Sequence, residues 1–101
     1  MNYIISENRL SHFIERYLDN FVKSKVFRTI DPYIVVSEIN PDDDNNFIDF
    51  MEHDRIDGRL WINKLFLESF MKLFAMDKQS SQKFISDWFS DRYGVQVKFV
   101  E

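Results

Sequence analysis

Carboxylates, amides and two histidines are the residues that could do chemistry in this 101-residue chain, because it contains no cysteine. That absence excludes a disulfide framework, a Cys-ligated zinc site and thiol catalysis. The segment Asp42-Asp43-Asp44-Asn45-Asn46 offers the clustered oxygens that Ca²⁺ prefers. Counted as an EF-hand loop from Asp42, however, it has Phe47 in place of the required glycine and His53 in place of the final glutamate. We interpret the segment as a solvated turn and predict no metal and no cofactor.

A second candidate is the run Glu52-His53-Asp54, in which a histidine between carboxylates could act as a general base or as half of a metal site. Either role needs a nucleophile or a second ligand. The only other histidine, His12, falls on the polar face of a predicted helix. We therefore place His53 at a surface strand end. Gly58 and Gly94 are the only glycines, and no G-x-S-x-G elbow occurs, so we predict that the protein is not an enzyme.

The charge distribution argues against direct binding of nucleic acid, because the net charge is −4 and residues 31–57 are acidic. An alternative is that these carboxylates imitate a phosphate backbone and occupy a basic groove on another protein. The residues that would do so are Asp42, Asp43, Asp44, Asp49, Glu52, Asp54 and Asp57.

Aromatic residues are unusually abundant, at 17% of the chain with 11 phenylalanines. Trp and Tyr are enriched at interface hot spots. The candidate partner-binding residues are accordingly Trp61, Trp88, Phe89 and Tyr93, together with Asp42, Asp43 and Asp44 of the acidic turn. Each aromatic residue could instead belong to the core, but a domain this small should leave at least one of them outside it. We expect a protein partner or a second copy of the chain, with a homodimer favoured.

An amphipathic helix is predicted from Ser6 to about Lys23, with Ser6 as its N-cap and Ile5 packing on Leu10. Its apolar positions are Leu10, Phe13, Ile14, Tyr17, Leu18, Phe21 and Val22. Residues 33–39 are rich in β-branched side chains and predict a strand that Pro41 ends.

Residues 47–53 fit either a helix or a strand, and the Asp57-Gly58 pair decides in favour of a strand. This dipeptide between residues 51–56 and 59–62 predicts a hairpin with a type I′ turn. Asn63 should then cap a helix that runs to about Met76, so rich in apolar residues that we expect it to lie centrally, between the sheet and other helices.

The last elements are a helix with Phe84, Ile85, Trp88 and Phe89 on its inner face, and a strand. Gly94 should end the helix, and residues 95–100 alternate as in a strand. The order α-β-β-β-α-α-β predicts one α+β domain over residues 1–101, with helices on one face of a mainly antiparallel sheet. We find no signal peptide and no membrane span, and expect a cytoplasmic protein.

Three short motifs carry a resemblance to a known group of proteins. They are Ser6-Glu7-Asn8-Arg9-Leu10, Asp54-x-x-Asp57-Gly58-x-Leu60, and Trp88-Phe89 followed by Tyr93-Gly94-Val95. Together they resemble small proteins encoded by marine bacteriophages, over most of the chain. The resemblance implies a virus-encoded protein that acts in a bacterial cytoplasm or in the virion, and it brings no catalytic residues.

The leading hypothesis is therefore a non-enzymatic protein-interaction module, self-associating or bound to a larger partner. The first alternative is a viral structural or assembly component. The second is the acidic inhibitor that mimics nucleic acid.

Overall fold

The computed structural model describes residues 7–101, with side chains from Arg9 onward. Its elements, in chain order, are α1 (Glu7–Lys23), β1 (Val26–Ile30), β2 (Tyr33–Asn40), β3 (Asp43–Asp54), β4 (Arg59–Ile62), α2 (Lys64–Phe74), α3 (Lys78–Tyr93) and β5 (Phe99–Val100). The predicted α+β class is confirmed, and its order is confirmed apart from one additional strand, β1. The predicted N-cap Ser6 and the contact of Ile5 lie outside the described residues.

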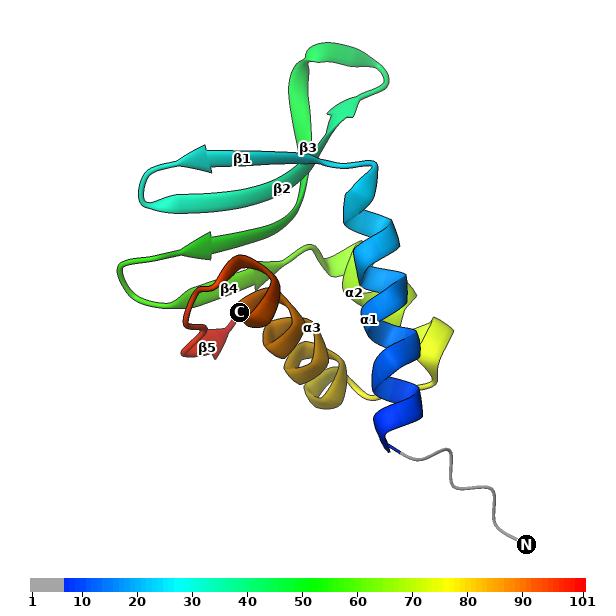
Figure 1. The fold of residues 1–101 in the computed structure, drawn as a ribbon. Coiled ribbons are helices and arrows are strands. Elements are labelled where there is room, and N and C mark those ends of the chain that lie inside the picture. The colour runs from blue at the N-terminus through cyan, green and yellow to red at the C-terminus, as the bar shows by residue number, and fades with distance from the viewer. Residues whose placement is uncertain (1–6) are drawn as a thin grey trace, which may run out of the picture.

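The sheet has the order β1-β2-β3-β4-β5. Its first four strands are antiparallel neighbours in chain order, and β5 pairs with β4 in parallel. The ladder of β2 and β3 continues past the ends of β1 and β4 as a two-stranded arm, residues 38–49, at the top of Figure 1. The sheet is therefore a single layer of five strands, of which only β2 and β3 extend into the arm.

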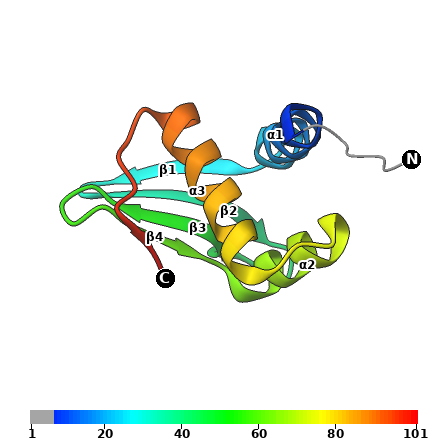
Figure 2. The ribbon, with the colours of Figure 1, turned by 90° about the horizontal axis from the view of Figure 1, so that it is seen from below.

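The helix α3 lies over one face of the sheet, and α1 lies on the same side, beside the strand ends, where α2 also lies (Figures 1 and 2). The indole Nε1–H of Trp88 joins α3 to α1 by donating to Asp19 Oδ1 at 2.9 Å. In the described residues no helix covers the opposite side of the sheet (Figure 2), which we call the open face. The predicted packing of helices on one face is confirmed for α1 and α3.

The core lies between the three helices and the sheet. From α1 it takes Ile14, Leu18 and Val22, whereas Phe13 of the same predicted stripe is 53% exposed. The remaining members of the buried cluster are Ile34, Val36, Met51, Leu60, Ile62, Phe66, Leu67, Phe70, Ile85, Trp88 and Phe89. Burial of these large side chains from water is the main favourable contribution to folding.

Capping residues fix where the C-terminal helices begin and end. The side chain of Asn63 accepts hydrogen bonds from the backbone N–H groups of Leu65 and Phe66, as predicted. Asp77 does the same for Ser80 at the start of α3, and Gly94 ends that helix with a φ of 63°. The predicted roles of Asn63 as a cap and of Gly94 as the helix end are therefore confirmed.

Two predictions about whole elements were wrong. The strand β1 was not predicted at all, although its residues pair with β2 from Val26 to Ile30. The helix α2 is not central, because Leu65 is 74% and Leu73 is 59% exposed, and only one side of this helix enters the core.

The loop and strand-end predictions need correction as well. The β3–β4 hairpin exists, but its loop has four residues, Asp54 pairs with Arg59, and only Gly58 has a positive φ, so it is not a type I′ turn. Of the acidic segment 42–46, which was predicted to be a turn, only Asp42 lies in a turn, since β3 begins at Asp43. The final strand is confined to β5 instead of residues 95–100.

Candidate functional site

The open face carries a row of side chains fixed by strand register. Arg28 is opposite Val35, Val35 is opposite Glu52, and Glu52 is opposite Trp61. Directly opposite residues share a face of the sheet. Because the neighbouring positions Val36, Met51 and Leu60 are buried in the core, the row must face away from the helices.

A polar network holds the centre of this face together. The hydroxyl of the fully buried Ser37 donates to Asp49 Oδ1 at 2.7 Å, and Arg28 Nη2 donates to the same oxygen at 2.9 Å. The guanidinium of Arg28 also lies 4.1 Å from the centre of the Phe47 ring, in cation–π range. A register shift between Val36 and Ser37 brings Ser37 opposite Asp49. The network therefore depends on this irregularity in the ladder.

Next to the network is a concave site of about 210 Å³, which we call the open-face pocket. It is lined by Asp49, Glu52, Arg59, Trp61 and Glu101. Arg59 Nη1 lies 3.3 Å from Glu101 Oε2. Among residues 9–101, Glu52 has no cationic partner. Because Asp49 is paired with Arg28 and Glu101 with Arg59, Glu52 is the one carboxylate of this pocket without a cationic partner among the described residues, and it lies beside the partly exposed indole ring of Trp61.

Apolar side chains extend the same face on both sides of the pocket. Ile30, Ile39, Phe47 and Phe99 are each about half exposed, and the register places all four on the open face. Exposed apolar side chains gathered on one face beside charged groups are found at interaction sites. The charged groups here are Asp49, Glu52, Asp54 and Glu101 against Arg28 and Arg59, so the face is acidic.

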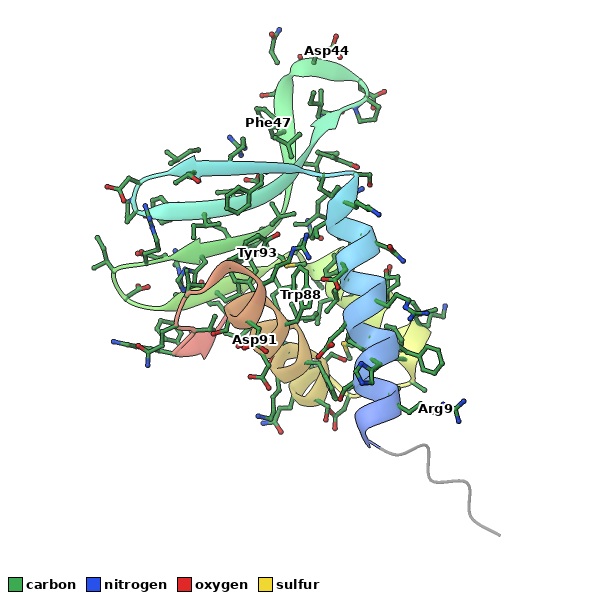
Figure 3. The ribbon with its side chains drawn as sticks, in the orientation of Figure 1. Arg9, Asp44, Phe47, Trp88, Asp91 and Tyr93 are labelled. Atoms are coloured by element: carbon green, nitrogen blue, oxygen red, sulfur yellow. The ribbon has the colours of Figure 1, made fainter. Side chains whose placement is uncertain are left out.

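The predicted acidic residues Asp42, Asp43 and Asp44 lie at the tip of the arm, where all three are exposed. Figure 3 shows Asp44 there, with Phe47 on the same arm. The Asp43 carboxylate accepts hydrogen bonds from the backbone of Asn45 and the side chain of Asn46. Both oxygens of the Asp43 carboxylate therefore accept hydrogen bonds from neighbouring residues of the same strand.

Three of the predicted aromatic contact residues lie on the helix side of the sheet instead. Phe89 is fully buried and Trp88 is 6% exposed, so both are core residues. Tyr93 is partly buried, and its ring stacks on Phe27 at 5.0 Å (Figure 3). Burial raises the pKa of Tyr93 above its usual range, opposed by a hydrogen bond with Arg92. Of the four aromatic candidates, only Trp61 lies on the open face.

The placement of His53 at the surface was wrong. It is 1% exposed, and its ring lies 5.8 Å from that of Phe89. Alternation along β3 explains this, because it directs His53 toward the helices while Glu52 and Asp54 point the other way. The histidine is therefore not flanked by carboxylates. Within the described part of the chain, no three His, Asp or Glu side chains are grouped so that they could hold a metal ion.

Sequence reasoning missed Phe47, Arg59 and Glu101 as members of the site, and it included Asp49 and Glu52 only as part of an acidic stretch. The alternation of residues 59–62 could have assigned Arg59 and Trp61 to one face. In β3 the register shift interrupts the alternation, so Asp49 and Glu52 do not have the even spacing of a regular strand face.

Among the described residues, no helix is both long and apolar enough to cross a lipid bilayer. Comparisons of the chain with protein-family models, with curated proteins and with solved structures found no match.

Proposed function

We propose that this protein is a non-enzymatic protein-interaction module that docks a basic partner on the open face of its sheet. The observation that carries the proposal is the open-face pocket, where Glu52 and its neighbouring carboxylates adjoin Trp61. A lysine or arginine side chain of a partner fits this chemistry, because carboxylates pair with its charge and an indole ring attracts cations. The surrounding apolar residues would supply buried contact area.

The charge of the open face favours a different protein over a second copy of this chain. In a face-to-face homodimer, the carboxylates of one open face would oppose those of the other, and such like-charge contacts are costly. A basic partner meets the same carboxylates with opposite charge. The three aspartates at the arm tip add to this attraction. We therefore place Asp42, Asp43 and Asp44 at the edge of the proposed interface and Trp61 at its centre.

The resemblance to marine bacteriophage proteins supports a partner inside an infected bacterium or in a virion. If the chain is instead an assembly component, neighbouring copies would cover the same apolar residues. The oligomeric state distinguishes these cases, because assembly depends on protein concentration.

The test is retention of proteins from a bacterial lysate on the immobilised wild type and on three immobilised variants with confirmed folding. Glu52→Lys reverses the charge in the open-face pocket, and Trp61→Ala removes its ring. Glu15→Lys makes the same charge change on an exposed position of α1, on the helix side of the sheet, and serves as the matched control. We expect a discrete protein to bind the wild type and Glu15→Lys, to be lost from Glu52→Lys and Trp61→Ala, and to elute with added salt.

Two results would contradict the proposal. A partner lost from Glu15→Lys but kept by Glu52→Lys would place the interface on the helices. Sedimentation that shows concentration-dependent association, abolished by Trp61→Ala, with no retained partner would favour self-assembly.

A further inference from the structure

A second, larger pocket adjoins the open-face pocket, because Trp61 and Glu101 line both of them. It lies where β4 leads into α2 and where α3 begins (Figure 2), and we call it the β4–α2 pocket. Its volume is about 400 Å³, against about 210 Å³ for the open-face pocket. Ligand-binding clefts commonly have volumes of roughly 300–1,000 Å³. The β4–α2 pocket is therefore large enough to receive a bulky side chain of a partner.

The apolar part of the pocket lining comes from two elements. Trp61 and Ile62 belong to β4, and Leu67 and Met71 belong to α2. Ile62 is 4% and Leu67 is 6% exposed, so both are held in place by the core, whereas Trp61 and Met71 are partly exposed. Transfer of an apolar side chain from water onto such a surface is favourable. The pocket therefore suits a large apolar residue such as leucine or phenylalanine.

The charged part of the lining is positive on balance. Lys64 and Lys78 have no carboxylate partner among residues 9–101. The lining also holds two carboxylates, of which Glu101 is paired with Arg59 and Glu68 is unpaired within the same range. Two unpaired lysines thus stand against one unpaired glutamate. The β4–α2 pocket has the opposite sign to the open-face pocket, where the unpaired group is a carboxylate.

We propose that the two pockets together bind one short segment of the partner, which carries a basic residue, a large apolar residue and an acidic residue in that order. The basic residue pairs with Glu52 in the open-face pocket. The apolar residue enters the β4–α2 pocket, and the acidic residue faces Lys64 and Lys78. Trp61 lies between the two pockets, at the centre of the contact, where aromatic residues contribute most to binding.

This inference rests on the proposed function, because it names the segment with which the basic partner would dock. It also adds a restriction on that partner. A uniformly basic segment would meet like charge at Lys64 and Lys78, which disfavours it. The order of charges therefore distinguishes specific docking from diffuse attraction to an acidic face.

The test is an NMR titration of the full chain with synthetic peptides, blocked at both ends, that carry lysine, phenylalanine and glutamate in this order with glycine spacers of graded length. We expect the best peptide to cause saturable shifts of the Trp61 indole, the Glu52 amide and the Met71 methyl group. Replacing its phenylalanine by alanine should weaken binding at least about tenfold. Exchanging its lysine and glutamate should weaken binding at least about fivefold at low ionic strength.

Two variants on α2 locate the apolar residue of the peptide. Met71→Gln introduces a polar group into the β4–α2 pocket. Leu73→Gln makes the same kind of change at a position that is 59% exposed and does not line the pocket, so it is the matched control. We expect Met71→Gln to bind the peptide several-fold more weakly and to lose less when the phenylalanine becomes alanine, which is the sign of a direct contact. Leu73→Gln should bind as the wild type does.

This inference and the proposed function can fail separately. If Glu52→Lys abolishes peptide binding, but neither the phenylalanine of the peptide nor Met71→Gln affects it, the open-face pocket stands and the two-pocket site is overturned. Equal binding of the peptide with exchanged charges also overturns the two-pocket site, since it would show diffuse attraction. So does a lack of saturable binding at every spacer length, whereas retention from the lysate still decides the proposed function. If Met71→Gln does not fold, the replacements in the peptide decide the question.

Discussion

Replacing Asn63 by alanine should destabilise the protein more than the loss of an ordinary helix cap. The Asn63 side-chain oxygen accepts from the N–H groups of Leu65 at 2.9 Å and Phe66 at 3.1 Å. Its side-chain nitrogen donates to the Asp49 backbone oxygen at 3.0 Å. One side chain thus starts α2 and ties it to β3, next to the polar network of the open face.

The expected loss has two parts. Removal of an N-cap typically costs about 1 kcal/mol, and removal of one partly buried hydrogen bond costs about another 1 kcal/mol. Asn63→Ala should therefore lower the free energy of unfolding by about 2 kcal/mol, which corresponds to a fall in Tm of roughly 10 °C for a domain of this size. Asn63→Ser keeps a hydroxyl acceptor for the cap but loses the amide donor, so it should lose only about 1 kcal/mol.

Urea unfolding followed by tryptophan fluorescence gives both values, and an unchanged m-value would show that the unfolded states are comparable. The control is Asn20→Ala, because Asn20 is an exposed asparagine of α1. A loss below about 0.5 kcal/mol for Asn63→Ala, within the range of ordinary surface substitutions, would refute the double role. Equal losses for Asn63→Ala and Asn63→Ser would refute the contribution of the cap.

Three further predictions concern backbone strain and pH. Gly94→Ala should lower the free energy of unfolding by about 1–2 kcal/mol because its φ is 63°, and Gly58→Ala should lower it further in the same urea assay, because its Cβ would also contact Lys98. The pKa of Asp77 is lowered by its hydrogen bonds to Ser80, so its stabilising effect is present above its ordinary value of 3.8 and is lost as the pH falls below that value. Asp77→Asn should not show that part of the acid loss when unfolding is measured across this range. Burial raises the pKa of Tyr93 above 10.0, so the wild type should lose stability as the pH rises through 10, and Tyr93→Phe should lose less in alkaline urea titrations.

Local signals were sufficient to predict the start of α2 and the end of α3, but not the end of α2, which was expected at about Met76 and lies at Phe74. Asn63, Asp77 and Gly94 act on backbone groups within a few positions of themselves, so their residue types alone indicate a cap or a stop. The α+β class followed from the order of such segments. The same reasoning could not determine which side of α2 would be buried, since Leu65 and Phe66 are both apolar and only packing against α1 and β3 distinguishes them.

The candidate site was harder to predict because it depends on strand register. The burial of His53 and the exposure of Glu52 depend on which face of β3 packs against the helices. No single residue type indicates which face that is. The strand β1 pairs on one side only and has no fully buried residue, so it lacks the apolar run of a central strand. Without β1 in the prediction, Arg28 could not be placed beside Asp49.

The bond between Trp88 and Asp19 joins residues 69 positions apart in the chain. The strands β1 to β4, by contrast, pair only with neighbours in sequence, so they can form early from short loops. During synthesis from the N-terminus, the core residues Ile14 and Leu18 of α1 are made well before Ile85 and Phe89 of α3. The core is therefore incomplete until α3 has been synthesised. A ribosome-bound chain that ends before α3 should remain a substrate for chaperones, because α2 and β3 cover only part of the apolar side of α1.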